Sequence, residues 1–204
     1  MAGPLFASAA TLFSARLLLL FFLHLLPGGV DPVRDPVSDY AVADEKRTRV
    51  LATLASWTAA TAWICLGLAL LLYSAHGAAE QGVGFWLLVL GLLLAVMPLV
   101  PTDRNGSKTT LRGRVHLLLA VAWFTLGYST IGPMGRFAGD SAGQMLGVLD
   151  VVAGVSLAAL VISLVLPPLR SRSFGIAERV FILVVTLAPL MASVDLTIRW
   201  LTRP

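Results

Sequence analysis

The stretch at residues 101–116, PTDRNGSKTTLRGRVH, is a polar segment between two long apolar runs, and it carries four lysines or arginines. The apolar runs on either side cover about residues 84–100 and 115–131. Each approaches the roughly 20 residues that a helix needs to cross a hydrocarbon core about 30 Å thick. A segment as polar as 101–116 stays outside the hydrocarbon, because lipid offers it no hydrogen bonds. The stretch therefore predicts two membrane-spanning helices joined by a water-exposed hinge.

The composition of the whole chain agrees with this interpretation. Of its 204 residues, 57% are hydrophobic and 13% charged, and the mean hydropathy is +0.86. Such a chain has too little polar surface to cover a soluble globule. We expect an all-α fold, a single domain over residues 1–204 made of a bundle of six transmembrane helices, with spans at about residues 5–26, 50–73, 84–100, 115–131, 145–166 and 177–201.

The basic residues indicate topology and no nucleic-acid partner, because they are scattered among short loops without interleaved aromatic residues. Of the 15 lysines and arginines, four lie in residues 30–49, four in 101–114 and three in 167–179. With six spans these three loops share one face. The positive-inside rule then makes the loops cytoplasmic and places both termini outside, in a multi-pass protein of the cell membrane.

The first span contains a charge near its middle, Arg16. A signal peptide would use Arg16 as its positive flank and residues 17–26 as its apolar core. The following residues 27–30, PGGV, offer no small-x-small cleavage site. We therefore expect a retained helix. The lone Cys65 lies in an apolar run, which predicts neither a disulfide framework nor a thiolate metal cluster.

The face with the hinge brings together the first group of candidate site residues, Ser38, Tyr40, Asp103 and His116, with His24 near the end of the first span. Ser38, Tyr40, Asp103 and His116 form the expected binding site. In a catalytic alternative, Ser38 is the nucleophile while Asp103 and His116 supply acid–base chemistry. His24, Asp103 and His116 are also the candidate ligands if a metal assists.

A structural alternative explains the same residues without a ligand. Here Asp103 fixes the hinge, His116 bonds a loop carbonyl, and Ser38 and Tyr40 pack across them. No HExxH pair and no G-x-S-x-G context accompanies these residues. The sequence predicts no cofactor.

A second group consists of four charges inside the spans, Arg16, Asp150, Asp195 and Arg199. Arg199 follows Asp195 by one helical turn, so the two share a helix face. Because an unpaired charge at the centre of a membrane helix costs about 2.5–3.5 kcal/mol, we expect these groups to pair with one another. The pairing serves either as a buried network that sets helix register or as a relay in a small proton-coupled transporter.

Short motifs in this chain are similar to those of one known family. They are Ser-x-Tyr at Ser38 and Tyr40, Pro-x-Asp at Pro101 and Asp103, His116, and a Glu-Arg pair at residues 178–179 opening the last span. With the six-span spacing, the chain resembles the bacterial membrane proteins of the domain-of-unknown-function 998 family over nearly its whole length. The resemblance implies six membrane helices without an established activity, and a distant similarity to the Frag1, DRAM and Sfk1 type points toward lipid organisation.

These observations favour a protein that binds or organises membrane lipid or a small amphiphile. The alternatives are a membrane-embedded hydrolase, metal-assisted or not, and a small proton-coupled transporter that uses Asp150 and Asp195. The residues leave open whether the protein is an enzyme. Lipid is the expected partner, and the sequence leaves protein partners open.

Overall fold

The computed structural model describes residues 2–73, 78–104 and 107–202, and these ranges contain helices and no strand. The long helices are α1 (Ala2–Leu25), α2 (Lys46–Leu72), α3 (Ala78–Val96), α4 (Leu111–Phe137), α5 (Asp140–Val165) and α6 (Pro167–Leu201). Two short 3₁₀ helices, η1 (Val37–Val42) and η2 (Met97–Leu99), lie in the first loop and before the hinge. All six long helices are long and apolar enough to cross a membrane, which confirms the predicted all-α membrane bundle.

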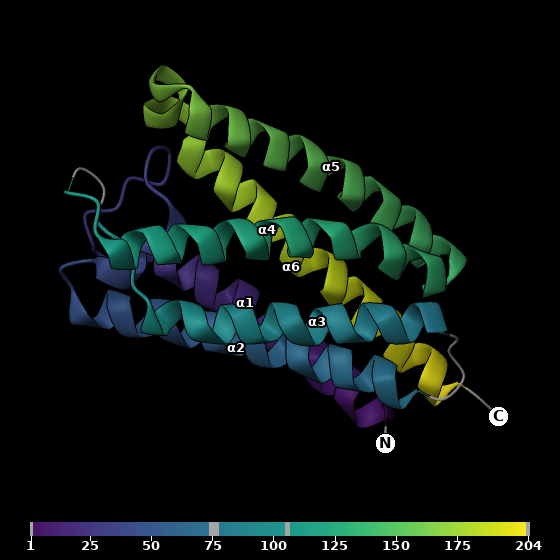
Figure 1. Cartoon of the computed structure of the whole chain (residues 1–204). Coiled ribbons are helices and arrows are strands. Elements are labelled where there is room, and N and C mark those ends of the chain that lie inside the picture. Colours follow the sequence, from purple (N-terminus) through teal and green to yellow (C-terminus); the bar gives the residue numbers. More distant parts are fainter. Residues whose placement is uncertain (1, 74–77, 105–106, 203–204) are drawn as a thin grey trace.

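The helices pack largely in chain order, and α6 closes the bundle by returning to α1 (Figure 1). The start of α1 and the end of α6 lie against each other, since a Cβ atom added to Gly3 would overlap the ring of Trp200. The N- and C-terminal ends of the chain therefore lie at one end of the bundle (Figure 1). The first loop and the hinge lie at the opposite end, which we call the loop end.

Small residues let α2 and α3 approach closely. A Cβ atom on Gly67 would lie 2.8 Å from the carbonyl oxygen of Gly84, and one on Gly91 would lie 2.9 Å from that of Ala60. Contact between helix backbones through glycine is a common way to pack helices in lipid, where burial of apolar surface alone supplies little drive for association.

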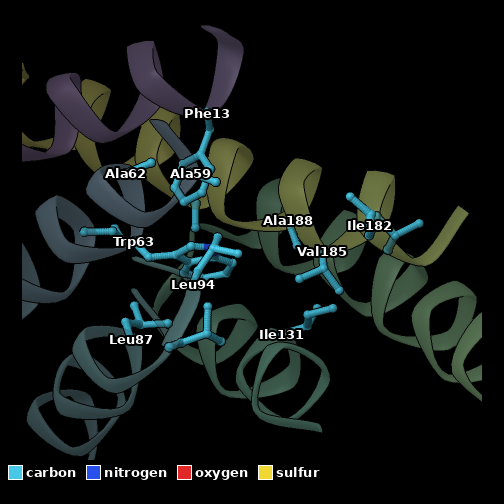
Figure 2. Packing of buried hydrophobic residues seen from close by; sticks show 14 of the residues in the cluster. Phe13, Ala59, Ala62, Trp63, Leu87, Leu94, Ile131, Ile182, Val185 and Ala188 are labelled. Carbon is cyan, nitrogen blue, oxygen red and sulfur yellow. The ribbon is translucent and has the colours of Figure 1, made fainter. Parts of the chain in front are cut away.

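The interior between the helices is filled by aromatic and aliphatic side chains (Figure 2). Trp63 of α2 meets Phe13 of α1 edge to face, with ring centroids 5.1 Å apart. Ile131 of α4 and Val185 of α6 belong to the same buried cluster. The outer faces are apolar as well, and on α5 Val151 and Val155 are each 66% exposed. A surface that is apolar on both sides of the helix wall is typical of a bundle immersed in lipid.

All six long helices begin before their predicted spans, and α4 and α6 extend furthest beyond them. α4 passes the expected end at residue 131 and continues through Pro133 to Phe137, while α6 starts at Pro167 instead of near residue 177. Proline is tolerated inside membrane helices because neighbouring groups satisfy the freed backbone, and it suits the first turn of a helix, where no backbone N–H partner is needed.

Candidate functional site

The first loop is fixed to α6 by a buried carboxylate. Glu178, only 5% exposed, accepts the backbone N–H of Val37 at 2.6 Å. Val37 opens η1, and Pro36 just before it has the extended backbone that ends the preceding turn. The contact joins residues 141 positions apart in the sequence. It places Ser38, on the same turn, at the loop end of the bundle.

Arg179 is the centre of a second set of contacts at this end. Its Nε donates to His24 Nε2 at 2.8 Å, and Nη1 donates to the carbonyl oxygen of Asp35 at 2.7 Å. Its guanidinium also lies 5.7 Å from the ring centroid of Tyr40, within the range of a cation–π contact. His24 Nδ1 donates to the carbonyl oxygen of Leu20 at 2.6 Å, so both ring nitrogens of His24 have partners. His24 and Tyr40 thus hold α1, the first loop and α6 together.

Asp103 holds the hinge in shape. Its two carboxylate oxygens accept the backbone N–H and the hydroxyl of Thr110, each at 2.7 Å. These bonds stabilise the carboxylate and lower the pKa of Asp103 below its usual value. Thr110 in turn caps α4 by accepting the N–H of Gly113 at 3.1 Å. A Cβ atom on Gly113 would overlap the Asp103 carboxylate, so the arrangement requires glycine there.

The hinge is also joined to the first loop by an exposed ion pair. Arg104 donates from both terminal nitrogens to the carboxylate of Asp44, at 2.9 and 2.7 Å. The hydrogen bonds first and the charge of Arg104 second lower the pKa of Asp44. The guanidinium of Arg104 is therefore already paired with a carboxylate of the same chain.

A cavity of about 240 Å³ lies inside this end of the bundle. Ser38 of the first loop, Thr102 of the hinge and His116 of α4 are among its lining residues, and Arg16 of α1 lines it too. Its other walls are mainly apolar and come from all six long helices, with Leu23 of α1, Ala52 of α2 and Leu94 of α3 on one side. The lining residues from α4, α5 and α6 include Leu117, Val121, Phe124, Leu160, Leu164, Phe174 and Ile182. Leu117 and Val121 are 49% and 48% exposed, so the cavity reaches the outer surface of α4.

Three polar groups on the cavity wall have no partner for at least one atom. His116 Nδ1 donates to the carbonyl oxygen of Val100 at 2.6 Å, while its Nε2 has no hydrogen-bond partner. The indole Nε1–H of Trp123 has none either. Arg16 is 6% exposed and forms no hydrogen bond or ion pair within the described part of the chain. Buried polar atoms without partners are rare, so two on one cavity wall, His116 Nε2 and Trp123 Nε1, together with the unpaired Arg16, indicate a site that accepts a polar molecule.

The sequence-predicted binding residues divide into two roles in this geometry. Ser38 and His116 line the cavity. Tyr40 and Asp103 do not line it and instead contact the residues that shape the loop end. For Asp103 and His116, the contacts with Thr110 and Val100 are those of the structural alternative, although His116 Nε2 stays available.

The four intramembrane charges do not form one cluster. Arg199 pairs with Asp195 at 2.9 Å and also donates to the carbonyl oxygen of Phe137. Asp195 accepts the N–H of Gly139 at 3.1 Å, so the pair fastens the α4–α5 turn to α6. Asp150 lies beside Gly132 of α4 and has no ion-pair partner among the described residues. Arg16 lines the cavity and is not paired with either aspartate.

The residues offered as metal ligands are not gathered either. Within residues 2–73, 78–104 and 107–202, no group of three or more His, Cys, Asp or Glu side chains is placed to hold a metal ion. His24 is bonded to Arg179 and Asp103 to Thr110. His24, Asp103 and His116 are therefore not placed as a set of metal ligands in the described structure.

The sequence does not predict that Arg16, Trp123 and Glu178 line the binding cavity. A signal for Arg16 exists in the first span, where the buried positions Ala9, Phe13, Arg16, Leu20 and Leu23 recur every three or four residues. This stripe faces the bundle, but leucine and phenylalanine also occupy the lipid-facing positions and hide it.

Six apolar helices around a partly polar cavity define a polytopic α-helical membrane protein. The family described as proteins of unknown function, DUF998, matches this chain over residues 7–195, and the chain belongs to that family. Neither a search of curated proteins nor one of solved structures finds a match.

Proposed function

We propose that this protein binds a membrane lipid or small amphiphile in the cavity at the loop end. The observation that carries the proposal is the combination, in one space, of apolar walls, two buried polar atoms without partners and the unpaired Arg16. Ligand sites are usually built this way, with apolar lining for the bulk of the ligand and a few polar atoms for orientation.

The access route favours a ligand that comes from the membrane. Leu117 and Val121 belong to both the cavity wall and the outer face of α4, the face that meets lipid. An alkyl chain leaving the cavity there stays in apolar surroundings. Ser38 and His116 at the loop end supply polar contacts, and Tyr40 and Asp103 position the two segments that carry them.

Native mass spectrometry of the protein purified in a non-ionic detergent tests the proposal. Ala120 lines the cavity, so Ala120→Trp fills it, while Ala158→Trp places the same bulk on the exposed face of α5. We expect a retained amphiphile in the wild type and in Ala158→Trp, and its loss from Ala120→Trp. Equal retention in both variants would locate the amphiphile outside the cavity and refute the proposal.

A further inference from the structure

The inner part of the cavity carries a positive charge, that of Arg16, without a negative charge beside it among the described residues. Arg16 is nine residues from the end of α1 at Leu25, so it lies about 14 Å from the loop end along the helix. Trp123 lies two turns of α4, roughly 10 Å, deeper than His116. The guanidinium and the indole N–H are both donors, and neither has an acceptor in the described structure.

No described residue of the protein supplies a counter-ion for Arg16. Glu178 is the only carboxylate among the described residues that line the cavity, and its Oε2 is engaged with Val37. Glu178 lies beside Arg179, which bonds His24 one residue from the end of α1, so this carboxylate is at the loop end and not at the depth of Arg16. Charged residues in membrane helices normally pair or face water or ligand. Arg16 therefore needs a partner from outside the chain.

We propose that the cavity takes the singly charged anionic head group of a single-chain amphiphile, with Arg16 as the counter-ion and the Trp123 indole N–H as a second donor. This inference rests on the proposed function and adds the chemical class of its ligand. A carboxylate has the charge and the two acceptor oxygens that these donors require.

The size and charge of the cavity determine the rest of the class. A volume of about 240 Å³ is below the roughly 300–1,000 Å³ of sites that enclose drug-sized ligands, so it admits a head group and the first part of one chain. One cation balances one negative charge, and Glu178 on the same wall opposes a second. The remaining chain leaves between Leu117 and Val121 into lipid.

His116 supplies a third contact and a means of selection. Because a carbonyl oxygen only accepts, Nδ1 carries a proton in the bond to Val100, and neutral His116 presents a lone pair on Nε2. A ligand hydroxyl or a water between the head group and the loop end satisfies that lone pair. Because His116 is closer to the loop end than Trp123, this contact lies between the anionic group and the loop end.

The test titrates purified protein in a maltoside detergent with dodecanoate, dodecanol, dodecyl phosphate and acetate, read as one-to-one adducts by native mass spectrometry. We expect the wild type to bind dodecanoate about tenfold or more tightly than dodecanol. Arg16→Gln abolishes that preference by weakening dodecanoate alone, Arg16→Lys keeps part of it, and Arg136→Gln, which removes an exposed arginine of α4, leaves it unchanged.

The remaining outcomes separate the two proposals. Equal binding of dodecanoate and dodecanol by the wild type, or a preference that survives Arg16→Gln, would overturn the counter-ion role while leaving amphiphile binding intact. Absence of saturable binding for every alkyl probe would overturn amphiphile binding itself. Tighter binding of dodecyl phosphate than of dodecanoate would refute the single charge, and displacement of dodecanoate by an equal concentration of acetate would refute the requirement for a chain.

Discussion

Replacement of Arg16 by methionine is expected to stabilise the ligand-free protein. Replacing a residue that is buried to this extent usually destabilises the protein, because the side chain's contacts are lost. Arg16 is 94% buried, as its exposed fraction is 6%, yet it has no hydrogen bond or ion pair in the described structure to lose. Methionine has a similar length and adapts its shape to irregular space.

The size of the effect follows from the cost of the charge. An arginine at the centre of a membrane helix costs about 2.5–3.5 kcal/mol. Because water entering the cavity recovers part of this, we expect a gain of about 1–2 kcal/mol. For a chain of this length, 1 kcal/mol shifts the melting temperature by roughly 2–4 °C. Arg16→Met should therefore melt about 2–8 °C above the wild type.

Arg199→Met is the matched control, since it removes the other arginine inside a span. Arg199 pairs with Asp195, whose side chain is 19% exposed, and it bonds the Phe137 carbonyl. Breaking a fully buried pair costs about 3–5 kcal/mol. Because the Arg199 side chain is 42% exposed, we expect a loss of about 1–2 kcal/mol.

Thermal unfolding of delipidated protein in detergent, followed by circular dichroism, measures both variants. A melting temperature of Arg16→Met as low as that of Arg199→Met would show that Arg16 holds the fold together and would refute this prediction. Added dodecanoate should raise the melting temperature of the wild type more than that of Arg16→Met, because the variant without the counter-ion binds dodecanoate more weakly.

Three further predictions concern the fold, the hinge and the topology. Gly91→Ala should melt below Gly147→Ala, since both gain helix propensity but only Gly91 faces a backbone carbonyl, at a steric cost of about 1–3 kcal/mol. Acidification to pH 4 and below should lower the melting temperature. Because the pKa of Asp103 is depressed in the folded protein, its ionised carboxylate stabilises the fold above the usual carboxyl pKa, and this stabilisation is lost as the carboxylate protonates. Asp103→Asn should reduce that fall in thermal scans at pH 5 and 3. Finally, Ser107→Cys should react with a membrane-impermeant thiol reagent only from the cytoplasmic side, and labelling from outside alone would reverse the predicted orientation.

The sequence was sufficient for the number of membrane helices because hydropathy and loop polarity depend on local composition. The polar stretch at residues 101–116 lies between the apolar parts of α3 and α4, as expected, and its last six residues form the start of α4, which begins at Leu111. The spacing of Asp195 and Arg199 likewise predicts their ion pair, since one helical turn separates them. The ends of the helices are harder to predict from the sequence, because Pro133 breaks helices in water but is accommodated inside α4.

The interior of the site depends on contacts that local patterns do not contain. The bond from Val37 to Glu178 and the bond from Arg179 to His24 each join distant parts of the chain. The sequence also does not show that the face of α1 with Arg16 is turned toward the bundle interior, because lipid and protein interior select the same apolar side chains. The sequence therefore predicts a cluster of Arg16 with Asp150 and Asp195, whereas in the structure Arg16 lines the cavity with His116.

Photolabelling with a dodecanoate analogue that carries a diazirine on its chain tests the central claim most directly. After irradiation in detergent and peptide mapping, we expect labels at the cavity mouth on α4, at Leu117 and Val121, and on α5, at Leu160 and Leu164, with competition by unlabelled dodecanoate. Labels spread over the exposed outer face of α5 around Val151, unaffected by competitor, would contradict a binding site in the cavity.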